Sequence, residues 1–188
     1  MDDGITGEQT RALILLAEAL DEVGVEYYLT GSVAAGLYGD ARMSNDIDVV
    51  IEVPRRRGPL VKVLSEDFEA DPEIVDEALR DRRMFNLLAP VSLAKIDVIP
   101  RDPKLDSDDV LTRRHRIALG DSMICVISPE DLVIAKLNWS KDSRSEMQQR
   151  DIRGLLARAD IDLRYIERKA GKLGLMEWFR EVRRAGHE

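Results

Sequence analysis

Cysteine and histidine are nearly absent from this chain of 188 residues, which has one cysteine and two histidines. A single thiol, Cys125, cannot form an internal disulfide, and its place in the apolar segment MICVI predicts a small core residue rather than a nucleophile. His115 and His187 lack the spacing of a zinc site. A disulfide scaffold and a histidine–cysteine zinc centre are therefore excluded, and a reducing compartment is expected.

The chain also lacks an apolar run long enough to cross a bilayer. Its first residues, MDDGITGEQT, are acidic and polar, which is unlike a usual secretory signal. The 44% hydrophobic and 34% charged residues are typical of a globular protein that buries a core. We expect a cytoplasmic protein with no membrane partner.

Negative charge dominates, with a formal net charge of -8. Residues 141–188 hold 12 Lys and Arg against 9 Asp and Glu, a net of +3, which leaves -11 for the first 140 residues. An acidic body argues against non-specific binding of duplex nucleic acid through the whole surface. The mildly basic tail can either contact a polyanion or form a solvated helical face.

Hydrophobic periodicity predicts strands and helices first and helices alone afterwards. Strands are expected at 25–30, 46–53, 84–89 and 93–100, with a hairpin over 116–127, and helices at 8–23, 32–38, 59–68 and 72–82. Later helices are expected at 129–140, 145–159, 163–172 and 174–185. This order predicts an α+β fold, in which a mixed sheet flanked by helices (1–127) precedes a small C-terminal helical lobe (128–188).

Three aspartates occupy strand positions that can bring them together. Asp46 and Asp48 share one face of the expected strand 46–53, whose apolar residues share the other face. Asp97 projects from a second strand, away from its apolar neighbours. If the two strands are adjacent, the three carboxylates repel one another unless a cation lies between them. Such oxygen ligands suit Mg²⁺ or Mn²⁺ together with substrate phosphates, whereas a solvated strand end is the alternative for Asp46 and Asp48 alone.

Gly31-Ser32 lies between the expected strand 25–30 and the next helix. Glycine allows the backbone to approach a phosphate closely, and the Ser32 hydroxyl can donate to a phosphate oxygen. A serine that merely caps the helix is the alternative. With acids at the start of the next strand, the turn favours a site for a triphosphate and two metal ions.

These segments resemble the nucleotidyltransferase superfamily typified by DNA polymerase beta. In that superfamily a hydrophobic-Gly-Ser turn precedes an Asp-hydrophobic-Asp segment and a later acid on another strand, as Gly31-Ser32, Asp46-Ile47-Asp48 and Asp97 do here. The 13-residue spacer, 33–45, is similar to that of the AbiEii and AbiGii toxin type of bacterial nucleotidyltransferase.

Further blocks of the toxin type are matched by KIDVI around Asp97, by EDLVIAKLNW through Lys136 and by QRDIRGLL through Asp151, so that the resemblance covers residues 25–158. The chain departs from the family in having Gly-Ser where many relatives have Gly-Gly, and Trp139 where the toxin motif has a small residue. The final helices match nothing in that pattern.

The resemblance implies roles for individual residues. Asp46, Asp48 and Asp97 would be the catalytic, metal-binding acids, and the nucleotide would be bound by Gly31, Ser32, Arg42, Lys136 and Asp151. The residues themselves leave alternatives open. Lys136, inside an apolar helical stripe, either extends to solvent or meets an anion. Asp151 is either solvated or orients Lys136 or a basic group of the nucleotide. Arg42 is either a phosphate contact or a surface arginine.

The function expected from this resemblance is transfer of a nucleoside monophosphate from an NTP to an acceptor, such as RNA, tRNA or a protein. A toxin of a toxin–antitoxin system, with a cognate antitoxin as partner, is one form of it. The first alternative is a transferase that modifies a small molecule similar to an aminoglycoside. The second is a non-catalytic nucleotide-binding or antitoxin-like module.

Overall fold

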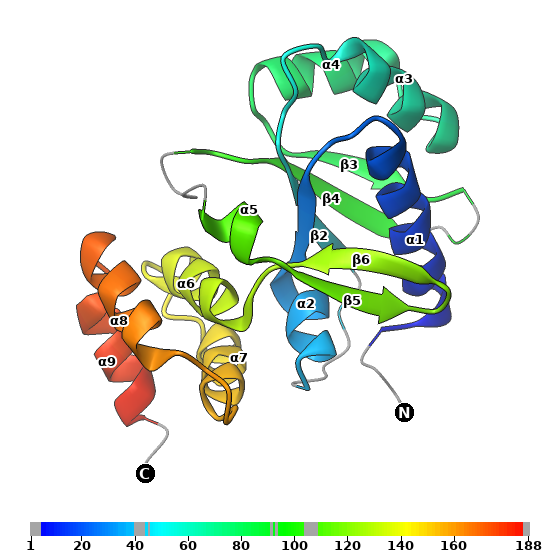
Figure 1. The fold of residues 1–188 in the computed structure, drawn as a ribbon. Coiled ribbons are helices and arrows are strands. Elements are labelled where there is room, and N and C mark those ends of the chain that lie inside the picture. Colours follow the sequence, from blue (N-terminus) through cyan, green and yellow to red (C-terminus); the bar gives the residue numbers. More distant parts are fainter. Residues whose placement is uncertain are drawn as a thin grey trace.

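The computed structural model describes residues 5–39, 44, 46–90, 92, 94–103 and 109–185. Within these residues the chain has the predicted α+β architecture, a mixed sheet flanked by helices (Figure 1). The first helix, α1 (Gly7–Glu22), begins with a capping box between Thr6 and Gln9. No helix in this described part of the chain has the length and apolarity to cross a membrane.

The sheet is built from β1 (Tyr27–Thr30), β2 (Asp46–Ile51), β3 (Phe85–Leu88), β4 (Lys95–Pro100), β5 (His115–Leu119) and β6 (Ser122–Val126). Over the described residues its strand order is β3-β4-β2-β1-β6-β5. The central strand β2 runs antiparallel to β1 and parallel to β4, while β1 runs parallel to β6. The outer strands β3 and β5 pair antiparallel with β4 and β6. Each strand predicted from the sequence is present, with ends shifted by up to two residues.

The remaining helices are α2 (Gly31–Leu37), α3 (Gly58–Asp67), α4 (Pro72–Arg80), α5 (Asp109–Arg113), α6 (Pro129–Ser140), α7 (Glu146–Leu156), α8 (Leu163–Lys172) and α9 (Met176–Arg184). The sequence did not predict α5, because five residues are too few to show helical periodicity. Figure 1 shows α3 and α4 together at the top and α6 to α9 gathered at the lower left. The expected boundary at 127/128 falls between β6 and α6.

Alternation along β2 and β4 divides apolar from acidic side chains. Ile47 and Val49 of β2 and Ile96 and Val98 of β4 are fully buried on one side of the sheet. The opposite side carries the aspartates. Since successive strand residues point to opposite faces, a shift of one residue in either strand would bury the acids and expose the core.

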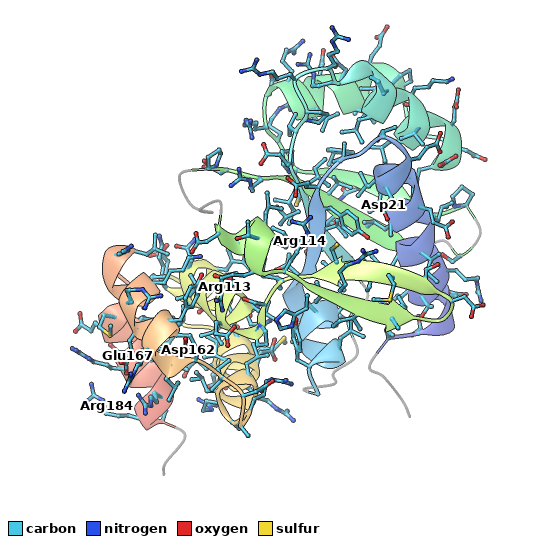
Figure 2. All side chains as sticks on the ribbon, in the orientation of Figure 1. Asp21, Arg113, Arg114, Asp162, Glu167 and Arg184 are labelled. Carbon is cyan, nitrogen blue, oxygen red and sulfur yellow. The ribbon has the colours of Figure 1, made fainter. Side chains whose placement is uncertain are left out.

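The first turn of α6 is fixed by a buried charge network (Figure 2, where Arg113 and Asp162 are labelled). Asp131 accepts hydrogen bonds from the Tyr165 hydroxyl at 2.6 Å and from the Lys169 ammonium at 2.7 Å, both from α8. Arg113 of α5 donates to Glu130 at 3.0 Å, and Glu130 in turn accepts from the backbone N–H of Asp162. These contacts tie α5 and α8 to α6, so they set the position of the rest of that helix.

Candidate active site

The three aspartates expected to form a site lie together on one face of the sheet. Strands β2 and β4 are parallel neighbours in the register that pairs Asp48 with Asp97 and Asp46 with Lys95. The clustering of the three aspartates was predicted on the condition that their two strands are adjacent, and β2 and β4 are adjacent. Asp97 is nearly buried, Asp48 is half-buried and Asp46 is exposed.

The surroundings of Asp48 disfavour its ionised form. Burial, together with the carboxylates of Asp97 and Asp46, raises the pKa of Asp48 to about 6, although the charges of Lys136 and Lys95 act in the opposite direction. The main cause is that a half-buried carboxylate loses hydration, and two like charges beside it add to the cost. An added cation would remove this cost, and such perturbed carboxylates are typical of functional sites.

Two polar residues without an assigned role in the sequence analysis complete this cluster. The Lys95 ammonium lies 2.9 Å from Asp97 Oδ1, 3.3 Å from Asp97 Oδ2 and 3.6 Å from Asp46 Oδ1. Asn86 of β3, directly opposite Asp97 in the antiparallel pair, donates its side-chain amide to Asp97 Oδ1. Lys95 could have been recognised from its i, i+2 spacing to Asp97, but Asn86 required knowledge of the β3–β4 register.

Gly31 has a steric reason to be glycine. Its φ is +69°, and a Cβ atom built there would lie 2.0 Å from Asp48 Oδ2 and 2.8 Å from its Cγ. No side chain fits at that distance, so the residue lets the backbone turn tightly against the carboxylate of Asp48. The group that approaches this glycine in the structure is therefore an acid of the site, and the close approach of a phosphate to Gly31 stays a prediction.

The side chains beside Gly31 line the same region. Ser32 is buried at the first turn of α2. Thr30 faces Asp48 directly across the β1–β2 pair and is 1% exposed. Within the described residues, its hydroxyl oxygen has no hydrogen-bond partner. A buried hydroxyl in this state is unfavourable by itself and is available to a bound polar group.

Lys136 does not extend to solvent. It is fully buried in α6, and its ammonium donates to Asp151 Oδ2 at 2.7 Å and to Gln148 Oε1 at 3.2 Å, both in α7. Asp151 is also buried, which excludes a solvated helix residue and agrees with the alternative that it orients Lys136. Because the charge of Lys136 lowers the pKa of Asp48, the buried pair is electrostatically coupled to the acids.

A cavity of about 250 Å³ lies further along the same face of the sheet, and its lining does not include the three aspartates. Its floor is formed by Tyr28, Val50 and Ile99, each two residues along its strand from Thr30, Asp48 and Asp97 respectively. Ala135, Asn138 and Trp139 of α6 form the opposite wall. Its lining is largely apolar with a few polar side chains, which is typical of sites for small molecules.

The donor types suit a divalent cation, although among the described residues no group of three or more His, Cys, Asp or Glu side chains is placed to hold a metal ion. Both oxygens of Asp97 are engaged by Lys95, and one of them also by Asn86. The ammonium of Lys95 thus stands between Asp97 and Asp46, where a cation is favoured, and carboxylate oxygens are the ligands that Mg²⁺ and Mn²⁺ prefer. Arg42, the remaining predicted nucleotide contact, lies outside the described residues.

Comparison with solved structures identifies the fold. An antigenic nucleotidyltransferase-like protein from Paracoccidioides brasiliensis superposes with a TM-score of 0.52 at 20% identity, covering 80% of this chain and 75% of that protein. The fold is therefore that of the nucleotidyltransferase-like proteins. No protein-family model and no curated protein sequence matches the chain.

Two antibiotic-modifying proteins are also among the structural matches. The antibiotic-resistance factor ANT(2'')-Ia matches with a TM-score of 0.48 at 15% identity, over 97% of both chains. The lincosamide antibiotic adenylyltransferase LnuA, bound to lincomycin, matches with a TM-score of 0.45 at 14% identity, over 81% of this chain and 98% of LnuA.

Proposed function

We propose that this protein is a nucleotidyltransferase, which moves a nucleoside monophosphate from an NTP to an acceptor hydroxyl and releases pyrophosphate. The observation that carries the proposal is the in-register pairing of Asp48 with Asp97, with Asp46 on the same face. Three carboxylates on one face of a sheet, on a nucleotidyltransferase-like fold, are suited to this chemistry.

In the proposed reaction, the acceptor oxygen forms a bond to the α-phosphorus while the bond between that phosphorus and the β-phosphate oxygen breaks. Asp46, Asp48 and Asp97 would hold Mg²⁺ or Mn²⁺, which supplies charge neutralisation at the phosphates. Asp97 would receive the proton of the acceptor hydroxyl, and its contacts with Lys95 would then have to loosen.

The triphosphate would contact the residues between the sheet and α6. Gly31 lets the backbone lie directly against Asp48, and the buried Ser32 and Thr30 hydroxyls beside it are donors of suitable chemistry for a phosphate. Lys136 would supply positive charge, held in place by Asp151. Arg42 remains a proposed phosphate contact from the sequence.

Two acceptor classes follow from different features. An RNA, tRNA or protein acceptor, including a toxin of the AbiEii type with its antitoxin, rests on the resemblance of KIDVI, EDLVIAKLNW and QRDIRGLL. A small molecule as acceptor is supported by the cavity of about 250 Å³ on the same face of the sheet, because its lining begins two residues along the strands from the acids.

Acceptor labelling tests the proposal. The protein is incubated with Mg²⁺ and each NTP labelled at the α-phosphate, together with total RNA, a protein extract or aminoglycosides. Label in one class that is lost in the Asp46→Asn/Asp48→Asn variant supports transfer and identifies the acceptor class. Absence of label from every class, combined with no Mg-NTP-dependent rise in the melting temperature, would refute the proposal. An NTP-dependent rise without label would favour the non-catalytic nucleotide-binding module.

A further inference from the structure

We propose that Lys95 is a built-in competitor of the divalent cation, an ammonium that occupies the metal position between Asp46 and Asp97 until the metal displaces it. The inference rests on the proposed function, because it concerns the same three acids. Its basis is geometric: the Lys95 ammonium contacts both oxygens of Asp97 and lies 3.6 Å from Asp46 Oδ1.

The strand register places Lys95 there. Lys95 is the parallel partner of Asp46 and lies two residues before Asp97, so all three side chains share one face of the sheet. A divalent ion that uses oxygens of Asp46 and Asp97 must approach them to about 2.0–2.6 Å. The Lys95 ammonium stands between Asp46 and Asp97, in the space that such an ion would occupy, and two cations that close would repel each other strongly. Metal binding and the present contacts of Lys95 therefore exclude each other.

The Lys95 ammonium can move away from the carboxylates, whereas that of Lys136 is enclosed. Its side chain is 41% exposed, whereas Lys136 is fully buried. A four-carbon stem on an exposed strand residue allows the ammonium to move into solvent or toward the phosphates of an incoming substrate. Asn86 keeps its hydrogen bond to Asp97, so the carboxylate stays oriented after Lys95 departs.

This arrangement makes metal binding depend on nucleotide. In the protein alone, the metal must break the ion pairs of Lys95 before it can bind. A triphosphate brings negative charge that receives the displaced ammonium and adds oxygen ligands to the metal. Metal and triphosphate therefore favour each other's binding, and the coupling must be reciprocal.

Binding of Mn²⁺, measured by the loss of its free electron paramagnetic resonance signal, tests the inference. We expect Lys95→Met to bind Mn²⁺ at least about ten-fold more tightly than the wild type, since a unit positive charge has been removed beside a divalent ion. Lys95→Arg should bind as weakly as the wild type. The control is Lys62→Met, an exposed lysine on α3 that pairs only loosely with Glu66, and it should change nothing. Asp46→Asn/Asp48→Asn gives the background from other surface acids.

A second measurement separates displacement from a general electrostatic effect. The rate at which acetic anhydride modifies Lys95, relative to Lys62, is followed by mass spectrometry with and without Mg²⁺. Displacement predicts a several-fold faster modification of Lys95 in Mg²⁺, whereas a purely structural ion pair predicts no change.

The outcomes distinguish this inference from the proposed function. Equal Mn²⁺ affinity of the wild type and Lys95→Met would overturn the competitor role while leaving the metal site intact. An unchanged Lys95 modification rate in Mg²⁺ would also overturn it. Failure of both proteins to bind Mn²⁺ above the Asp46→Asn/Asp48→Asn background would remove the metal site and the inference together.

Discussion

The candidate site contains two lysine–aspartate pairs of similar geometry in opposite environments. Lys95 lies 2.9 Å from Asp97 on the open face of the sheet, and Lys136 lies 2.7 Å from Asp151 between α6 and α7. The side chain of Lys95 is 41% exposed, whereas that of Lys136 is completely enclosed. The partly exposed Lys95 can leave its nearly buried partner for solvent, whereas the second pair is buried on both sides and is costly to break. The first pair can therefore be exchanged during a reaction, while the second serves as a fixed charge.

The largest expected effect removes the acids that define the open site. Asp46→Asn/Asp48→Asn should abolish nucleotidyl transfer and specific Mn²⁺ binding, because two of three carboxylate ligands are lost. The fold should persist, since repulsion around Asp48 is relieved. Transfer assays measure the loss of activity, and circular dichroism shows whether the fold persists. A double variant with wild-type transfer would end the proposed metal site.

Breaking the buried pair should have the largest effect on stability. Lys136→Met should lower the unfolding free energy by about 3–5 kcal/mol, because Asp151 loses its buried ion-pair partner. For a lysine that extended from the apolar stripe into solvent, the same change would be neutral or stabilising. Chemical denaturation measures the loss. Lys136→Met/Asp151→Leu should recover much of it. Lys95→Met offers a contrast and should cost less, since Asp97 keeps its hydrogen bond from Asn86. Equal losses for Lys136→Met and Lys95→Met would contradict the comparison.

Gly31 and Gly24 form a matched pair that isolates the close approach to Asp48. Both have positive φ, +69° and +67°, but a Cβ at Gly24 would meet nothing within 4 Å. Gly24→Ala should cost only the roughly 1–2 kcal/mol of a left-handed alanine. Gly31→Ala should cost roughly 2–5 kcal/mol, because overpacking against Asp48 adds to the same strain. Similar unfolding free energies for the two variants would show that the Asp48 side chain can move away from residue 31 without loss of stability.

The free energy of unfolding should depend on pH because ionisation of Asp48 is unfavourable in the folded protein. Its pKa of about 6 lies above the ordinary value, so the folded protein binds more protons than the unfolded chain between about pH 4 and pH 6. This group's contribution to stability is therefore complete below that window and lost as pH rises through it.

Asp48→Asn should accordingly raise the unfolding free energy at pH 7 by roughly 1–2 kcal/mol, allowing for solvent screening, and the gain should disappear near pH 4. Thermal melts of both proteins at a series of pH values provide the measurement. A gain that is independent of pH would mean that Asn is favoured for another reason.

The smallest expected effect concerns the hydroxyl of Thr30. Thr30→Val should raise the stability of the protein without ligands by up to about 1 kcal/mol, because a buried oxygen without a hydrogen-bond partner among the described residues is removed. The rise in melting temperature caused by Mg-NTP should shrink if the hydroxyl binds substrate. An unchanged ligand effect would assign Thr30 to packing alone.

The sequence predicted the fold and the acid cluster because both follow from short-range patterns. Alternation in DIDVVI and KIDVI placed Asp46, Asp48 and Asp97 on faces opposite to the core, and adjacency of β2 and β4 was the single condition left to the structure. Lys95 was visible in the motif, but its contact with Asp46 depends on the register between two strands.

The remaining features arise from contacts between distant segments. Asn86 reaches Asp97 only through the β3–β4 pairing, and the burial of Lys136 depends on how α7 covers α6. The short helix α5 carries Arg113, whose contact with Glu130 no local pattern predicts. Such contacts are set by packing, which local periodicity does not encode.

The parallel pairing of β2 with β4 also bears on how the chain folds. Parallel strands need a crossover, and here it includes α3, α4 and the edge strand β3 before β4 can return beside β2. Asp48 and Asp97 are therefore far apart until a large loop has closed, and such non-local pairing forms slowly. A divalent ion that needs both carboxylates therefore cannot bind before β2 and β4 have paired. The ion should therefore slow unfolding of the native protein and leave the rate of folding unchanged.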